Sequence, residues 1–272
     1  MLPSKVRSGV PSSPMATSFE YSRQARTYDR TRAASPSVLA PLRAALGDRR
    51  GTLVDVGGGT GNYARALADE GWRPVVLDRN PGMLGRAASK HLPVALGDAS
   101  ALPVADGSAD AVVFVSMLHH VPDWQAALAE ARRVVRPGGV VVVMAFTREQ
   151  VDVHWVLGYL PATLAHFARL HQTRGELLGA LPGAVEHSVL YEDVVDGSVA
   201  ALCRRPELLL DPEVRAQTSL FEWAETHTPD ELADGMARLE ADLATGVRPQ
   251  DADPGRRAAL GDASVLAWRR PA

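Results

Sequence analysis

Short apolar runs alternate with helix-like repeats along the first half of the chain. We predict buried strands at the runs, over 52–56, 74–77, 93–96, 110–115 and 140–144. Between the runs, apolar residues recur at helical spacing, as over 63–70. Because strands that are apolar on both faces need helices on both sides, the alternation predicts an α/β fold with a parallel sheet.

The N-terminal part has a different pattern. Residues 1–18 are rich in proline and serine and predict a disordered extension, within which Met15 is a second candidate start. Residues 19–50 predict two helices, and Gly47 is the expected C-cap of the second. We interpret these helices as a lid at the beginning of a single domain that covers 19–272.

The second half is mainly helix-like. We expect a small helical cap over 147–180 and 198–246, and two further strands at 185–191 and 263–268. The last long helix is predicted to begin with a capping box formed by Thr228 and Glu231. A polar loop is expected over 247–257.

A glycine-rich stretch after the first strand marks a ligand site. Asp55 is followed by Gly57, Gly59 and Gly61, and a helix begins there. Glycine lets the backbone approach a ligand closely, and the following helix directs free N–H groups at it. This position in an α/β sheet binds nucleotide-like cofactors. The segment 59–64 also satisfies G-x-G-x-x-A, so a nicotinamide oxidoreductase stays open.

Two acids narrow the choice of cofactor. A carboxylate at Asp55 would be a poor neighbour for a pyrophosphate and suits a cationic group such as an amino-acid ammonium. Asp78 follows the second strand and can accept hydrogen bonds from both ribose hydroxyls. Enzymes that use NAD share this second feature, so Asp78 supports nucleoside binding without choosing between cofactors.

Four motifs in order resemble those of class I S-adenosylmethionine (SAM) methyltransferases. The stretch 55–61 resembles their first motif, and 78–84 resembles their acid-x-x-x-x-Met-Leu pattern. The run 97–103 looks like their adenine-binding loop. The string from His119-His120-Val121 to Arg136-Pro137-Gly138-Gly139 is typical of them, whereas dehydrogenases do not show it.

The resemblance implies a doubly wound, Rossmann-like, seven-stranded sheet with an antiparallel last strand, and SAM as cofactor. In the menaquinone- and ubiquinone-type members, the segment matching Tyr28 and Arg32 covers the cofactor. Met83 would pack on the adenine and Asp98 would accept from its amine. The implied cofactor-binding residues are Tyr28, Arg32, Asp55, Gly57, Gly59, Gly61, Asp78, Arg79, Met83, Asp98, Ala99, Ser116 and His120.

The expected reaction is methyl transfer to a small apolar or aromatic acceptor, in natural-product or quinone-type metabolism. His119 and His120 are candidate general bases. Candidate acceptor-binding residues are Tyr21, Tyr28, His119, Trp155, Tyr159 and Phe167. Whether carbon, nitrogen or oxygen is methylated, and whether a base is needed, stay open. A protein of this fold without methyl transfer, such as a cyclase or a ligand-binding regulator, is a further alternative.

Composition excludes several other classes. The net charge of −3 provides no strong field for nucleic acid. Cys203 is the sole cysteine, so neither an internal disulfide nor a cysteine-based metal cluster is expected. There is no secretory signal pattern, and no run approaches the roughly 20 apolar residues of a membrane span. We therefore expect a cytoplasmic protein with a small-molecule acceptor and no metal, for which a homodimer is one possible assembly.

Overall fold

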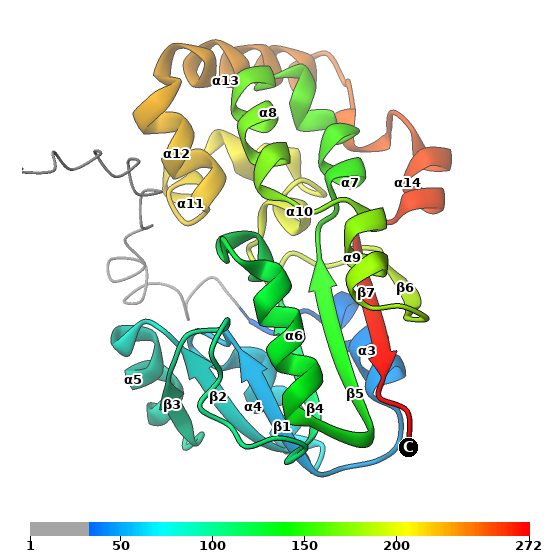
Figure 1. Cartoon of the computed structure of the whole chain (residues 1–272). Coiled ribbons are helices and arrows are strands. Elements are labelled where there is room, and N and C mark those ends of the chain that lie inside the picture. Colours follow the sequence, from blue (N-terminus) through cyan, green and yellow to red (C-terminus); the bar gives the residue numbers. More distant parts are fainter. Residues whose placement is uncertain (1–32) are drawn as a thin grey trace, which may run out of the picture.

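The computed structural model describes residues 33–272 as a sheet flanked by helices, with a helical cap above it (Figure 1). The strands are β1 (Thr52–Val56), β2 (Arg73–Asp78), β3 (Val94–Leu96), β4 (Ala109–Val115), β5 (Val135–Ala145), β6 (Val185–Val189) and β7 (Ala263–Arg269). Their order is β3-β2-β1-β4-β5-β7-β6. Strands β1 to β5 are parallel, and β7 is antiparallel to both neighbours. The predicted fold class is confirmed.

The helices of the first half are α3 (Pro36–Leu46), α4 (Asn62–Asp69), α5 (Pro81–Ser89), the 3-10 turn η1 (Leu118–His120) and α6 (Trp124–Val134). Those of the second half are α7 (Arg148–Asp152), η2 (Trp155–Gly158), α8 (Pro161–Leu170), α9 (Arg174–Ala180), α10 (Val199–Leu202), η3 (Pro206–Leu210), α11 (Pro212–Arg215), α12 (Ser219–His227), α13 (Pro229–Ala244), η4 (Pro249–Asp251) and α14 (Pro254–Leu260).

Successive residues of β4 explain why its sequence is apolar without interruption. Val112 and Phe114 belong to one apolar cluster, which includes residues of α6 and α9. Ala111 and Val113 belong to a second cluster, which includes residues of α3. Because side chains alternate between the faces of a strand, two covered faces require apolar residues at every position.

The cap has an apolar core of its own above the carboxyl ends of the parallel strands (Figure 1). Residues of η2, α8, α12 and α13 form this core, among them Leu160, Leu164, Phe221 and Leu239. Helix α9 is different: its Leu177 packs in the cluster on the sheet. The cap therefore forms a second layer that faces the edge of the sheet where parallel α/β folds bind their ligands.

Two local predictions for the second half are wrong. Thr228 forms no side-chain cap on α13. The Glu231 carboxylate accepts instead from the backbone N–H groups of Ala162, at 2.7 Å, and Thr163, at 3.0 Å, and so caps α8. The residues expected to form a polar loop contain η4 and the start of α14. The local sequence pattern assigned the Glu231 carboxylate to its own helix, α13, but the folded chain brings this carboxylate to the start of α8.

Among the described residues, no helix is long and apolar enough to cross a membrane. The predictions for residues 1–18, Tyr21, Tyr28 and Arg32 lie outside the described residues.

Candidate active site

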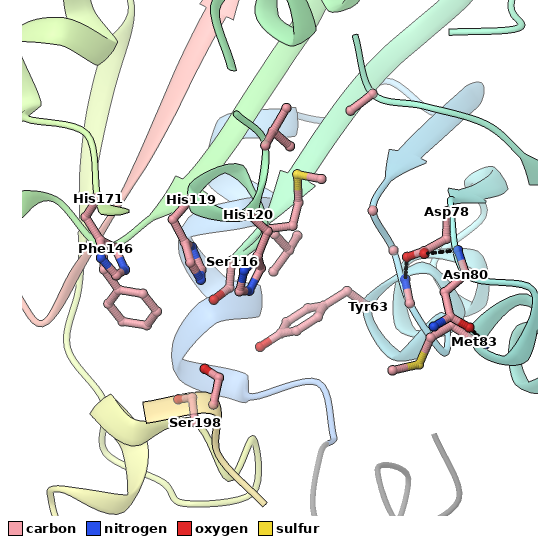
Figure 2. A pocket seen from close by; sticks show the side chains of 18 of the residues that line it. Tyr63, Asp78, Asn80, Met83, Ser116, His119, His120, Phe146, His171 and Ser198 are labelled. Atoms are coloured by element: carbon pink, nitrogen blue, oxygen red, sulfur yellow. Dashed lines mark hydrogen bonds between the residues drawn. The ribbon is translucent and has the colours of Figure 1, made fainter. Parts of the chain in front are cut away.

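A cavity of about 950 Å³ lies between the carboxyl ends of the parallel strands and the cap. Figure 2 shows Asp78, Asn80 and Met83 on one side of it and His171 and Phe146 on the other. We call these sides the cofactor end and the far end. The cofactor end is formed by loops that follow β1, β2 and β3, and the far end by residues that follow β4 and β5 and by the cap.

The glycine loop after β1 forms the floor of the cofactor end. Gly57, Gly59 and Gly61 have φ values of +65°, +57° and +77°, a region that glycine adopts without strain. A Cβ atom at Gly57 would collide with the side chain of Met117. One at Gly59 would meet nothing within 4 Å, so this glycine borders open cavity.

Gly61 has a structural place and does not line the cavity. It is the N-cap of α4, and a Cβ there would approach Leu92 at 2.6 Å and Ala87 at 3.2 Å. Its prediction as a cofactor contact is therefore not supported by its position. The glycine provides close packing between the loop and α5, on which Ala87 lies.

Asp78 connects two loops at the cofactor end. Its Oδ2 accepts from the N–H of Gly59 at 3.0 Å, and its Oδ1 accepts from the N–H of Asn80 at 2.8 Å. Asn80 in turn caps α5 and accepts from the N–H of Met83. The carboxylate thus fixes the glycine loop while lining the cavity, together with Arg79 and Met83.

Asp55 is the least satisfied acid of the site. Its side chain is 1% exposed, and its Oδ1 has no hydrogen-bond partner. Burial, and secondarily the charge of Asp78, raises the pKa of Asp55 to about 7. A buried, unpartnered carboxyl in the wall of the cavity is suited to a cationic ligand group nearby, which would favour its charged form.

Asp98 lies in the loop after β3. Its carboxylate accepts from the N–H of Ser100 at 2.8 Å and from its hydroxyl at 2.6 Å. These bonds, with a smaller contribution from Arg79, hold the pKa of Asp98 below its usual value. Asp98 is ionised at neutral pH and lines the cavity beside Ala99, which is buried.

Imidazole rings gather toward the far end. His119 lies 3.9 Å from His120 and stacks on His171 at 4.5 Å, measured between ring centroids. Burial lowers the pKa of all three, to about 4 for His120. They are therefore neutral at physiological pH. Ser116, at the end of β4, has a φ of +51° and also lines the cavity.

Sequence reasoning missed several lining residues. Phe146 follows β5, and His171 follows α8. Tyr63 lies in α4 and donates its hydroxyl to Asp196 Oδ2 at 3.0 Å. Tyr63 immediately follows the glycine motif, which was an available signal. His171 and Asp196 had none, because only the folded chain brings them to the cavity.

The far end includes one of the three aromatic residues predicted beyond β5. Phe167 lines the cavity, whereas Trp155 and Tyr159 do not. The indole N–H of Trp155 donates to the Cys203 carbonyl at 3.3 Å, and the Tyr159 hydroxyl donates to Asp242 at 2.6 Å. Both pack in the cap core, so their positions do not support the prediction of acceptor contacts. Within residues 33–272, no group of three His, Cys, Asp or Glu side chains could hold a metal.

The family model described as a methyltransferase domain matches residues 54–143. An uncharacterised methyltransferase of Mycobacterium avium is 33% identical over 214 residues, which are 71% of this chain and 79% of that protein. The chain belongs to the class I SAM-dependent methyltransferases. This excludes the nicotinamide oxidoreductase that the glycine pattern had left open.

Other relatives of this methyltransferase match over shorter lengths. Demethylmenaquinone methyltransferases of Renibacterium salmoninarum and Beutenbergia cavernae are 36% and 43% identical over 49% and 38% of this chain. The chain spans about half the length of these relatives, 56% and 44%. A crystal structure described as a methyltransferase from an antibiotic biosynthesis pathway of Anabaena variabilis superposes with a TM-score of 0.74. Its identity is 25%, and the match covers 88% of this chain and 98% of that one.

The cofactor end of the methyltransferase fits SAM. Asp55 lies in the cavity wall with a buried carboxyl that a nearby cationic group would stabilise in its charged form, and the open space beside Gly59 can receive a ligand at backbone distance. Asp78 and Asp98 provide two further carboxylates along the same wall.

Proposed function

We propose that this protein transfers the methyl group of SAM to a small, neutral acceptor that is largely apolar or aromatic and binds at the far end. The observation that carries this proposal is that one cavity extends from the three acids to an apolar wall formed by the cap and by the residue that follows β5. That wall contains Phe146, Val151, Leu164, Phe167 and Leu220. An apolar wall with few polar groups is typical of small-molecule sites.

The charges around the cavity argue against an anionic acceptor. Among the described residues that line the cavity, Arg79 is the single lysine or arginine, and it lies beside Asp78 at the cofactor end. The imidazoles at the far end have lowered pKa values and carry no charge at neutral pH. A phosphate or carboxylate on the acceptor would therefore be desolvated without a partner.

The residues of this chain would bind the cofactor and align it with the acceptor. Asp55 would receive the ammonium of the cofactor, Asp78 its ribose hydroxyls and Asp98 its adenine amine, while Met83 would pack on the adenine. When bound, SAM supplies a methyl group that its sulfonium already makes electrophilic. Alignment of the acceptor and exclusion of water can then lower the barrier by roughly 7–11 kcal/mol.

The names of the relatives favour two acceptor classes. The name demethylmenaquinone methyltransferase and the antibiotic biosynthesis pathway of the solved structure both point to small-molecule acceptors, which agrees with a site of this size. We therefore propose a quinone-type or natural-product acceptor. A cyclase or a ligand-binding regulator of the same fold is the alternative that the test below must separate.

The test has two stages. SAM should raise the melting temperature, whereas NAD should not. At a hundredfold excess of SAM over its Kd, the free energy of unfolding should increase by about 2.7 kcal/mol. Methyl-labelled SAM is then incubated with 1,4-naphthoquinol and 2-naphthol, and with phosphoethanolamine as a charged control. Label in the extracted naphthalene products supports the proposal. SAM binding without transfer to a neutral aromatic compound, or transfer to phosphoethanolamine instead, contradicts it.

A further inference from the structure

Backbone groups fix opposite tautomers in two histidines that line the cavity. His171 Nδ1 lies 2.8 Å from the carbonyl oxygen of Phe167. A carbonyl can only accept, so Nδ1 carries a hydrogen. Burial keeps the pKa of His171 below its usual value, and Arg148 adds to this effect, so the ring is neutral. Its Nε2 therefore presents a lone pair.

His154 has the reverse arrangement. Its Nδ1 accepts from the backbone N–H of Val156 at 3.3 Å, at the start of η2. Burial lowers the pKa of His154 to about 4, so this ring is also neutral. A neutral imidazole has one N–H, and here it must be at Nε2. His154 therefore presents a hydrogen-bond donor.

Both Nε2 atoms are available to a ligand. His154 and His171 line the cavity, and neither Nε2 forms a hydrogen bond with a described residue. Neither is among the polar atoms sealed in the protein without a partner. The far end thus offers one acceptor atom and one donor atom on rings whose orientation the backbone fixes.

We propose that the methyl acceptor carries a hydroxyl, which gives its proton to His171 Nε2, and a second oxygen, which accepts from His154 Nε2–H. This inference rests on the proposed function and narrows its acceptor to hydroxy-carbonyl aromatic compounds. The hydroxyl proton goes to Nε2, and the electron pair left on the acceptor forms the bond to the methyl carbon. The pair of the broken carbon–sulfur bond stays on sulfur, and His171 later returns its extra proton to water.

This assignment makes His171 the general base, in place of His119 and His120, which the sequence indicated. No described hydrogen bond fixes the ring of His119, which is stacked on His171 and tilted against His120. The stack leaves His119 a positioning role, because it keeps the plane of His171 in place. His171 differs in having an anchored Nδ1, which is the arrangement that orients a catalytic imidazole.

The tautomers can be observed directly. Long-range ¹⁵N–¹H spectra of the histidine-labelled full chain distinguish Nδ1–H from Nε2–H rings, and His171→Asn and His154→Asn assign the two signals. We expect Nδ1–H for His171 and Nε2–H for His154. If both rings have the same tautomer, or if either is protonated at pH 7, the inference is wrong whatever the enzyme methylates.

Ligand binding provides the second readout. The probe is 7-hydroxycoumarin, which has a phenol and a carbonyl and changes absorbance on ionisation. 7-Methoxycoumarin lacks the hydroxyl, and 2-naphthol lacks the carbonyl. With S-adenosylhomocysteine present, 7-hydroxycoumarin should bind about 3- to 10-fold more tightly than either analogue, which corresponds to one hydrogen bond in each comparison.

Matched variants separate the two hydrogen bonds. His171→Asn keeps a donor for the Phe167 carbonyl but removes Nε2, and should cancel the preference over 7-methoxycoumarin. His154→Gln keeps a donor near the Nε2 position and should retain the preference over 2-naphthol, which His154→Asn should lose. His91→Asn, at a left-handed residue that does not line the cavity, is the control and should change nothing.

Calorimetry with S-adenosylhomocysteine distinguishes the two levels of failure. If neither the wild-type protein nor the variants bind S-adenosylhomocysteine, the proposed function fails. If it binds normally but the probe preferences are absent, or persist in His171→Asn and His154→Asn, the tautomer inference fails and the proposed function stands.

Discussion

The two ends of the cavity use different chemistry. The cofactor end relies on acids and backbone N–H groups within 55–98, several of which hold one another in place, as Asp78 holds Gly59. The far end relies on apolar side chains and neutral imidazoles from segments between 115 and 220. Charge and close backbone approach suit a ligand with a fixed cationic group. Shape and hydrogen-bond direction suit a neutral acceptor, and they can be varied without disturbing the cofactor.

The largest effect is expected at the cofactor end, from Gly59→Val. Its side chain would project into open cavity and occupy the cofactor's space. We expect the affinity for SAM to fall by at least about 100-fold while the sheet stays folded. Calorimetry and circular dichroism measure the two properties.

Gly246→Val is the matched control for backbone strain. Gly246 also has a positive φ, of +85°, and a Cβ there would meet nothing within 4 Å, but it does not line the cavity. Both variants should lose similar stability, and Gly246→Val should bind SAM normally. Equal affinities in the two variants would show that the glycine loop does not hold the cofactor.

The next effect compares two acids. Asp78→Ala removes the proposed ribose contact and also frees the N–H groups of Gly59 and Asn80, so we expect a roughly 10- to 100-fold loss of SAM affinity. Asp98→Ala removes an exposed carboxylate whose hydrogen bonds, among residues 33–272, go to Ser100 alone, so a loss of roughly 3- to 10-fold is expected. Titration calorimetry gives both values. A larger loss from Asp98→Ala would reverse the assigned roles.

A pH series tests Asp55. Burial raises its pKa from 3.8 to about 7, so between these values the folded protein binds a proton that the unfolded chain has released. The stability of the free protein should therefore fall as pH rises through this window, and Asp55→Asn should remove that contribution.

Binding of SAM should show the opposite trend. A cationic partner favours ionised Asp55, so affinity should weaken below about pH 7, by at most about tenfold per pH unit. Calorimetry at pH 6 in buffers of different ionisation enthalpy should detect proton release, which Asp55→Asn abolishes. Proton uptake, or no release, would place the ammonium elsewhere.

The difference between the two ends explains what the sequence could predict. Asp55 and Asp78 lie at the carboxyl ends of β1 and β2, and Asp98 lies just beyond β3; because parallel strands end at one edge, their convergence follows from the pattern. Gly61 matched the motif but packs against α5. The same turn needs one glycine, Gly59, beside the open cavity and another, Gly61, for close packing.

The far end could not be predicted in this way. His171 reaches the cavity only because α8 ends there, and the position of α8 depends on the cap core and on Glu231. Trp155 and Tyr159 have the composition of an aromatic pocket, yet hydrogen bonds to Cys203 and Asp242 hold them inside the cap. Local pattern does not distinguish an aromatic residue that faces a ligand from one that faces its own core.

The smallest effect tests the place of Tyr159 in the cap core. Tyr159→Phe removes the hydroxyl that donates to Asp242, and we expect a loss of about 1 kcal/mol in the free energy of unfolding. The cation–π contact with Arg238 and the buried ring are kept. Because Tyr159 does not line the cavity, the affinities for SAM and for 7-hydroxycoumarin should stay within about twofold of the wild type. Phe167→Leu, which changes a lining residue, is the comparison and should weaken the probe but not SAM. A Tyr159→Phe variant that loses the probe at unchanged stability would return Tyr159 to the acceptor site.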